Sequence, residues 1–357
     1  MKTIFILYGG KSVEHDISII TALQVYKTAS KNYDCKLIYV DEKGKWWTGK
    51  NLSNPSIYVC FDKKCKKKKS VKPIFGDGCF LFGKKKVKPF AVVLCNHGLN
   101  GEDGSIASVM KLVGVPYASS SLLSSAVMMD KSFTKMILDQ YSILNAEYYC
   151  IKKGEEISSA NLEFPLIVKP ANLGSSVGIS VCRDEQSFND AVSYAFEFDD
   201  KILVEKFLTE AREFNCACFR FKDKLYTSKV IEIRKNDFFT FEEKYLKEKN
   251  ELLNEIEEDI VTQVENLTKM VYQVFECFGV VRIDYLYSHG KLYVNELNSI
   301  PGALSSYMFK ENFDEILDLL IEESVDRFQK EQEKVSYFKS DALKLYEKLS
   351  GKIVVKK

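Results

Sequence analysis

A short apolar segment that ends in two glycines begins the chain and restricts its fold. Residues 3–8 are continuously apolar and lead into Gly9-Gly10, a pattern typical of a parallel strand buried on both faces. A helical pattern over about 17–30 and a second apolar run at 36–40 come next, and a third run spans 89–94. Because strands alternate with a helix, the sequence predicts a doubly wound parallel sheet of the α/β class.

The carboxyl ends of these strands form the expected ligand side of the sheet. In open α/β sheets, ligands bind beyond the carboxyl ends of the strands. The segment Gly9-Gly10-Lys11-Ser12-Val13-Glu14 follows the first strand, and His97-Gly98 follows the third. We therefore expect both segments beside a ligand, in a first domain that covers residues 1–120.

A second unit is predicted over residues 121–208. It contains a helix around 130–140 and the apolar strand 166–168. This strand leads into Gly174-Ser175-Ser176-Val177-Gly178, and a further strand follows at 179–181.

The remaining residues, 209–357, form the third predicted unit. It has a charged loop at 234–249, a long amphipathic helix over about 251–278, and the strands 281–287 and 291–297. The residues alone therefore indicate a three-part α/β chain.

The charge balance argues against nucleic-acid binding through a general positive field. The chain has 51 Lys and Arg against 50 Asp and Glu, a formal net charge of +1. The run Lys63–Lys69 has no interleaved aromatic residues, so a solvated loop or hairpin is favoured there. No apolar run reaches the ~20 residues that span a bilayer, and the segment before Gly9 is too short for a signal-peptide core. We expect a cytoplasmic protein that binds neither nucleic acid nor membrane.

The ten cysteines predict free thiols. None forms a CxxC motif, and several lie in apolar segments, where cysteine behaves as a small hydrophobic residue. Without an export signal, reduced thiols are expected. A zinc site of Cys60, Cys65 and Cys79 is a minor alternative, because the spacing is irregular and no histidine lies nearby.

The segment 174–178 is a candidate phosphate loop. No GxxxxGK[ST] motif is present, which excludes a P-loop. Glycines let the backbone approach an anion, and exposed N–H groups and hydroxyls bond its oxygens. Lys131 and Lys169 lie on neighbouring predicted elements and would neutralise a polyphosphate. The alternatives are an ordinary hairpin turn and two lysines that point to water.

Asp284, Glu296 and Asn298 form a candidate metal site. If their strands pair through Ser288-His289-Gly290, the two acids reach one point, and Glu296 and Asn298 share a face because side chains two apart point the same way. Two carboxylates and an amide oxygen suit Mg²⁺ that holds nucleotide phosphates. A satisfied polar pair at a sheet edge is the alternative. Arg282 offers a planar fork to a carboxylate or an oxyanion, or else pairs with one of the acids.

Taken in order, these motifs resemble the D-alanine–D-alanine ligase family over about residues 3–310. The segments that carry the resemblance are Gly9-Gly10-Lys11-Ser12-Val13-Glu14-His15, His97-Gly98, Gly101-Glu102-Asp103-Gly104, Pro116-Tyr117, Ser125-Ala126, Met129-Asp130-Lys131, Val168-Lys169-Pro170, Gly174-Ser175-Ser176-Val177-Gly178, Lys244-Tyr245, Arg282-Ile283-Asp284, Asn295-Glu296-Leu297-Asn298 and Pro301-Gly302. The resemblance implies an ATP-grasp fold, in which two α+β lobes hold ATP between them. It also implies a homodimer that uses ATP and two Mg²⁺ ions, or Mn²⁺, in peptidoglycan synthesis.

The implied reaction joins two D-alanines through an acyl phosphate. By resemblance, Glu14 would hold the ammonium of the first amino acid and would be linked by hydrogen bonds to Ser175 and Tyr245, which would hold the charged loop over the site. Arg282 and the backbone of Gly302 would stabilise the oxyanion. The alternative for Tyr245 is a surface aromatic residue.

The resemblance also implies the remaining contacts. The residues implied to contact ATP are Lys131, Lys169, Ser175, Ser176, Glu205, Lys206, Phe207, Leu208, Glu213, Lys244 and Asn295. The implied metal ligands are Asp284, Glu296 and Asn298, and the implied amino-acid contacts are His97, Ser305 and Ser306. For His97, packing or capping is the alternative.

The turn after Pro301-Gly302 departs from the family pattern. A Thr/Ser-rich turn usually grips the second amino acid, whereas this chain ends the turn with the bulkier Tyr307-Met308. Relatives that use D-lactate tend to have histidine where this chain has Tyr245, so an amino-acid acceptor is expected. The first prediction is D-alanyl-D-alanine synthesis. A D-alanine–D-serine or other D-alanine–X ligase and a catalytically silent nucleotide-binding homologue are the alternatives.

Overall fold

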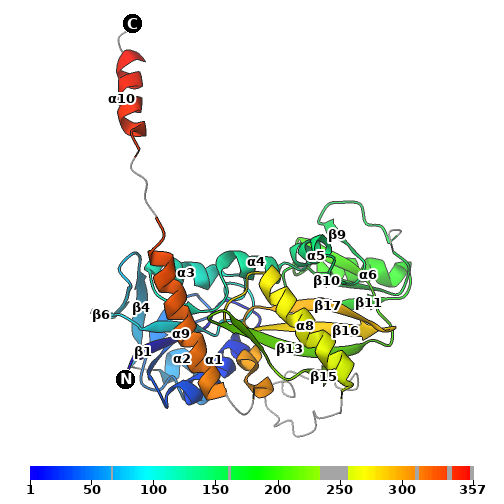
Figure 1. Ribbon diagram of the computed structural model, residues 1–357, viewed down its shortest axis with the longest axis horizontal. Coiled ribbons are helices and arrows are strands. Elements are labelled where there is room, and N and C mark those ends of the chain that lie inside the picture. Colours follow the sequence, from blue (N-terminus) through cyan, green and yellow to red (C-terminus); the bar gives the residue numbers. More distant parts are fainter. Residues whose placement is uncertain (66, 160–161, 234–255, 310–312, 336–339, 354–357) are drawn as a thin grey trace.

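The fold consists of three β-sheets that succeed one another along the chain, with helices packed on them (Figure 1). The computed structural model describes residues 1–65, 67–159, 162–233, 256–309, 313–335 and 340–353. The three sheets confirm the predicted order of a parallel-rich α/β sheet and two further lobes. We keep 1–120, 121–208 and 209–357 as the proposed domain boundaries. In the described part of the chain, every helix is too short or too polar to cross a bilayer.

The first sheet has eight strands in the order β6-β5-β4-β3-β2-β1-β7-β8. They are β1 (Thr3–Gly9), β2 (Asp34–Val40), β3 (Trp46–Thr48), β4 (Lys69–Ile74), β5 (Cys79–Phe82), β6 (Lys85–Val87), β7 (Ala91–Leu94) and β8 (Tyr117–Ala118). Strands β2, β1 and β7 are parallel, as predicted, β8 adds a further parallel strand, and β1 is almost completely buried. From β2 to β6 the sheet continues with antiparallel pairs. The sequence did not predict them, because β3, β4, β5 and β6 have only three to six residues.

Helices α1 (His15–Ala29), α3 (Ser105–Val113) and α9 (Phe313–Gln332) pack against the first sheet. Helix α9 comes from the other end of the chain, yet its Leu317 and Ile321 belong to the same hydrophobic core as β1. The C-terminal part of the sequence therefore returns to the N-terminal sheet. Helix α10 (Ala342–Ile353) stands away from the rest of the molecule (Figure 1).

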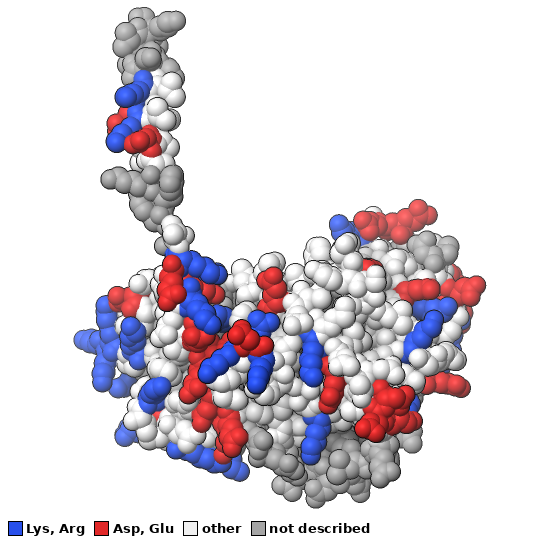
Figure 2. Space-filling model, in the orientation of Figure 1, with Lys and Arg blue, Asp and Glu red and all other residues white. Residues whose placement is uncertain are grey.

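The lysine-rich segment is more structured than the predicted solvated loop. The short helix η1 (Pro55–Cys60) precedes it, α2 (Phe61–Lys64) includes its first two lysines, and β4 begins at its last residue, Lys69. Lys68 pairs with Asp62, and its Nζ lies 4.6 Å from the centre of the Phe61 ring. Acidic and basic side chains are interspersed on the face drawn in Figure 2, in keeping with the near-zero net charge.

The second sheet is antiparallel, with the order β11-β10-β12-β9. Its strands are β9 (Tyr148–Lys152), β10 (Leu166–Pro170), β11 (Ser180–Cys182) and β12 (Lys201–Lys206), and the neighbouring helices are α4 (Leu122–Met129), α5 (Lys131–Gln140) and α6 (Glu185–Ala195). Asp130 caps α5 by accepting hydrogen bonds from the N–H groups of Ser132 and Phe133. This cap makes Lys131 the first residue of the helix. The predicted loop 174–178 lies within the segment 171–179, which joins β10 to β11.

The third sheet has the order β14-β13-β16-β17, with β15 also paired to β13. Its strands are β13 (Arg212–Phe221), β14 (Lys224–Thr227), β15 (Ile231–Ile233), β16 (Val281–Ser288) and β17 (Lys291–Asn298), and it is followed by η2 (Gly302–Met308), while α8 (Glu258–Val274) packs on it. The predicted hairpin is confirmed: in its register Asp284 stands opposite Glu296, and Arg282 opposite Asn298.

Candidate active site

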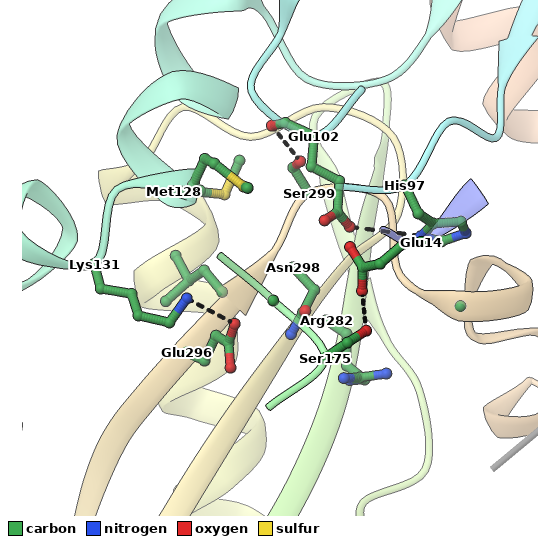
Figure 3. A pocket seen from close by; sticks show the side chains of 14 residues that line it. Glu14, His97, Glu102, Met128, Lys131, Ser175, Arg282, Glu296, Asn298 and Ser299 are labelled. Atoms are coloured by element: carbon green, nitrogen blue, oxygen red, sulfur yellow. Dashed lines mark hydrogen bonds and ion pairs between the residues drawn. The ribbon is translucent and has the colours of Figure 1, made fainter. Parts of the chain in front are cut away.

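One pocket is lined by the end of the first sheet, the 171–179 loop and the β16–β17 hairpin (Figure 3). Its lining residues include Glu14, His97, Glu102, Lys131, Gly174, Ser175, Arg282, Glu296, Asn298, Ser299 and Gly302. Most of them are polar or charged, and they come from all three predicted units. The fold therefore brings residues from distant motifs together.

Glu14 and Ser175 connect two sides of the pocket. Glu14 precedes the first turn of α1, and the hydroxyl of Ser175 donates a hydrogen bond to Glu14 Oε1. Gly98 permits this arrangement, because it has a φ of +64° and a Cβ there would lie 2.6 Å from Glu14 Oε2. Oε2 is buried and has no hydrogen-bond partner among the described residues. It can therefore accept a hydrogen bond from a ligand.

The surroundings of Glu14 make its ionised form costly. Burial raises the pKa of Glu14 and the Glu102 carboxylate raises it further, while the hydrogen bond from Ser175 and the charge of His97 oppose them. A buried carboxylate in this state is stabilised by a nearby cation. The site thus suits the ammonium group of an amino acid.

His97 is held at three atoms. Its backbone N–H donates to Ser18 Oγ at 2.8 Å, its Nε2 lies 2.8 Å from Thr21 Oγ1, and its Nδ1 lies 3.6 Å from Glu102 Oε1. The side chain is 4% exposed and still lines the pocket. His97 is thus both packed in the core and available to a ligand.

Lys131 and Glu296 form an ion pair at the side of the pocket near the 171–179 loop. Lys131 Nζ lies 3.3 Å from Glu296 Oε1 and donates to the carbonyl of Leu173 at 2.7 Å. Desolvation favours the neutral form of Glu296, but Lys131, Lys169 and Arg282 outweigh it and hold the pKa of this carboxyl below its usual value. Glu296 is therefore ionised close to Lys131 and Lys169.

Arg282 pairs with Asp284, the alternative contact named for it above. Its Nε donates to Oδ1 at 2.7 Å and its Nη2 to Oδ2 at 2.9 Å, while Asn298 Nδ2 donates to Oδ2 at 3.1 Å. Among the described residues, no group of three or more His, Cys, Asp or Glu side chains could hold a metal ion. Asp284, Glu296 and Asn298 nevertheless lie near the same end of the hairpin, and two carboxylates with an amide oxygen are a donor set that would suit Mg²⁺.

Glu205 lies buried between two lysines. Its Oε2 is 2.9 Å from Lys169 Nζ, and its Oε1 is 3.1 Å from Lys135 Nζ. Burial would raise the pKa of Glu205, but the two lysines hold it below the usual value. Burial also lowers the pKa of Lys135, although Glu205 opposes this effect. Lys169 also acts electrostatically on Glu296, so this buried cluster adjoins the Lys131–Glu296 pair.

We expect Lys135→Met to reduce the free energy of unfolding by about 2 kcal/mol, because it removes one of two cations beside a buried carboxylate. Since the folded-state pKa of Glu205 is depressed, its contribution to stability is present above its unfolded pKa and is lost as the pH falls. Urea unfolding at pH 7 measures the loss. Lys153→Met is the control, because Lys153 forms an exposed pair with Asp200. Equal losses in the two variants would contradict this prediction.

The turn η2 has an unusual backbone. Ala303, Leu304 and Ser305 have φ values of 54°, 47° and 54°, the left-handed region that non-glycine residues rarely occupy. Gly302 lines the pocket. The hydroxyl of Ser305 is fully buried without a hydrogen-bond partner among the described residues, and Ser306 is partly buried outside the pocket lining. The backbone of this turn is therefore closer to the pocket than its serine side chains.

Several predicted nucleotide contacts lie away from this pocket. The N–H groups of Lys206 and Phe207 bond the carbonyls of Glu147 and Pro165. Glu213 lies on β13 and Asn295 on β17. Leu208 directly follows Phe207, and Ser176, with a φ of 57°, directly follows Ser175. None of these four residues lines the pocket. Lys244 and Tyr245 lie outside the described residues.

Sequence reasoning missed Ser18, Thr21 and Lys135. Ser18 and Thr21 are three residues apart on α1 and face His97, a spacing that only the helical period reveals. Lys135 follows Lys131 by one helical turn, and nothing in the sequence distinguishes it from an exposed lysine. Glu102 was part of a quoted motif but was given no role.

Comparison with known proteins tests the resemblance over most of the chain. The family profiles for the D-ala D-ala ligase N-terminus and C-terminus match residues 3–120 and 137–316. The D-alanine–D-alanine ligase of Thermosipho melanesiensis is 40% identical over 346 residues, which cover 92% of this chain and 95% of that protein. The solved D-alanine-D-alanine ligase of Coxiella burnetii has a TM-score of 0.80 at 25% identity and covers 98% of this chain and 99% of that chain. The VanG D-Ala:D-Ser ligase from Enterococcus faecalis has a TM-score of 0.78 at 27% identity, with 90% and 99% covered. The chain therefore belongs to the D-alanine–D-alanine ligase family and has its ATP-grasp fold.

Proposed function

We propose that this protein is an ATP-dependent ligase that joins two D-alanines into D-alanyl-D-alanine, a precursor of peptidoglycan. The observation that carries the proposal is the convergence of the Glu14–Ser175 contact, the Lys131–Glu296 pair and Arg282 on one pocket (Figure 3). The reaction needs a group that holds an ammonium, cations that hold phosphates and a donor to an oxyanion. These three contacts match those needs.

In the first step, a carboxylate oxygen of the first D-alanine attacks the γ-phosphorus of ATP. The bond from this phosphorus to the oxygen of ADP breaks, and ADP leaves with the electron pair. Glu14 binds the ammonium of this D-alanine, and Lys131 and Lys169 bind the phosphates. The product is an acyl phosphate.

In the second step, the amine of the second D-alanine attacks the acyl carbon. The carbonyl oxygen becomes an oxyanion, for which the Arg282 guanidinium and the N–H of Gly302 are the proposed donors. The intermediate then collapses: the C–O bond to phosphate breaks, phosphate leaves with the electron pair, and the proton that the amine loses passes to the leaving phosphate as the peptide bond forms. Water must be kept out, because it also hydrolyses an acyl phosphate.

We also propose that Asp284, Glu296 and Asn298 hold Mg²⁺ here. Bound Mg²⁺ would neutralise charge on the phosphates of ATP. In this protein the residues themselves do the rest: Lys131 and Lys169 orient the phosphates, and Arg282 changes partner from Asp284 to the reacting group. A homodimer and a cytoplasmic location complete the proposal; free thiols at all ten cysteines and the use of ATP support the latter.

The acceptor is the least constrained part of this proposal. A D-alanine–D-serine ligase is the second candidate, and the similarity to the VanG D-Ala:D-Ser ligase favours it. By resemblance, the altered turn is the expected contact of the second amino acid, and its Tyr307 is 44% exposed. Ser305 and Ser306 remain proposed acceptor contacts, and Tyr245 a proposed partner of Glu14.

The test is phosphate release from Mg·ATP with D-alanine alone and then with D-serine or D-lactate added, with products identified by mass. We expect D-alanyl-D-alanine from D-alanine alone. A mixed product formed in preference would assign the protein to the second candidate. Absence of phosphate release with every acceptor would refute both and favour the catalytically silent homologue.

A further inference from the structure

A buried threonine connects helix α1 to two parts of the candidate site. Thr21 is 0% exposed, and its Oγ1 accepts a hydrogen bond from the N–H of Ala303 at 2.9 Å. The same oxygen lies 2.8 Å from His97 Nε2. Ala303 directly follows Gly302, which lines the pocket, whereas Thr21 is not itself among the lining residues. Any effect of Thr21 on the reaction must therefore act through His97 or through the turn.

The Thr21 hydroxyl selects the nitrogen of His97 that carries the proton. A hydroxyl has one hydrogen to donate, and its oxygen already accepts the N–H of Ala303. Among the described residues, the partners of Thr21 Oγ1 are the N–H of Ala303, which is a donor, and His97 Nε2, whose lone pair is therefore the acceptor for that hydrogen. The imidazole proton then resides on Nδ1, which faces Glu102 Oε1 at 3.6 Å. A proton on Nε2 instead would leave the Thr21 hydrogen buried without this acceptor, which is unfavourable.

The charges around His97 agree with this tautomer. The carboxylate that faces the ring is that of Glu102, whose Oε1 lies 3.6 Å from Nδ1. A hydrogen on Nδ1 is directed toward this acidic side of the pocket (Figure 3). Ser18, one turn before Thr21, fixes the backbone of the same residue. Helix α1 thus holds His97 at both its main chain and its ring.

The hydrogen bond from Ala303 to Thr21 helps to hold the left-handed backbone of η2. Three consecutive left-handed residues, 303–305, persist only where surrounding contacts hold them. The bond from Ala303 to Thr21 holds the first of the three, immediately after Gly302. Loss of this bond would free the turn next to the proposed oxyanion donor.

We propose that Thr21 is a positioning residue for the ligase reaction, which holds His97 in its Nδ1–H tautomer and fixes the start of η2 against α1. The predicted effect of Thr21 on the reaction rate rests on the proposed function. The predicted proton position on His97 does not, because it can be measured without activity.

The tautomer is measured by ¹⁵N NMR of the imidazole nitrogens in the full-length protein. The chain has three histidines, so His97→Gln assigns the signals of His97. We expect a protonated Nδ1 and an unprotonated Nε2 in the wild type and in Thr21→Ser. In Thr21→Val, which has nearly the same shape but no hydroxyl, the preference for Nδ1–H should be lost. A wild-type protein with the proton on Nε2 would overturn the inference.

Kinetics then test the consequence for the reaction. Wild type must first form a D-alanyl dipeptide; failure there refutes the proposed function, while the NMR result still judges the tautomer. In Thr21→Val, kcat/KM for D-alanine should fall about tenfold, as expected for the loss of one buried hydrogen-bond arrangement. The KM for ATP should stay within about twofold, and Thr21→Ser should recover most of the loss.

Thr268→Val is the matched control. Thr268 is 0% exposed on α8 and bonds Tyr285, away from the pocket lining. The Thr268→Val substitution should lower the melting temperature without a selective change in kcat/KM for D-alanine. If Thr21→Val behaves like this control, or if Thr21→Ser fails to restore activity, Thr21 is only a packing residue and the proposal is wrong.

Discussion

Glu296→Gln should reduce kcat by about a hundredfold to a thousandfold, the range found when one electrostatic contact to a transition state is removed. Glu296 is ionised beside Lys131, Lys169 and Arg282, which hold its pKa below the usual value against desolvation. The amide of glutamine keeps the shape but loses the charge that a divalent cation requires. The variant should also require more Mg²⁺ for half-maximal activity.

The fold should survive this change. The Glu296 side chain is 30% exposed and lies at the pocket surface, so the loss of its pair with Lys131 is screened by solvent. We expect the melting temperature to fall by no more than about 4 °C, since about 1 kcal/mol moves it by 2–4 °C in proteins of 150–250 residues. Glu323→Gln is the control, because Glu323 is buried on α9 and accepts the N–H of Lys222 outside the pocket. Wild-type turnover in Glu296→Gln would refute the metal assignment.

Features with a local signal were predictable from the sequence. The β16–β17 hairpin follows from two apolar runs around a glycine turn, and its register then places Asp284 opposite Glu296. The loop after β10 follows from its glycines and serines. The approach of Ser175 to Glu14, 161 positions apart, was reached only through the resemblance, because no local pattern encodes it.

Features that depend on tertiary packing were not predictable. The antiparallel half of the first sheet is built from strands of three to six residues, too short for a clear pattern. The return of α9 to that sheet reflects complementarity between surfaces distant in sequence. Lys135 is a typical helix-surface residue by its spacing, yet it is buried because Glu205 on β12 faces it. Thr21 likewise acquires its partners only when α1, His97 and η2 meet.

Glu14→Gln should raise the KM for D-alanine about a hundredfold and leave the KM for ATP nearly unchanged, since removing one partner of a desolvated charge pair costs about 2–5 kcal/mol. The Glu14 carboxylate has a buried, unpartnered Oε2 that an ammonium group can reach. Glutamine can still accept the hydrogen bond of Ser175, so the loss isolates the charge. Steady-state kinetics with each substrate varied in turn measure both constants.

The pH dependence and the stability of the same variant separate binding from folding. Because burial and Glu102 raise the pKa of Glu14, kcat/KM for D-alanine in the wild type should fall with decreasing pH through an apparent pKa above the ordinary glutamate value of about 4.3. Glu14→Gln should lose this limb. A raised folded-state pKa also means that ionised Glu14 destabilises the fold above its unfolded pKa, so stability declines as the pH rises through that window. Glu14→Gln should therefore melt no lower than the wild type at pH 7.5 while it binds D-alanine poorly. A variant that loses stability, or that keeps the wild-type acid limb, would show that Glu14 supports the fold rather than the ammonium.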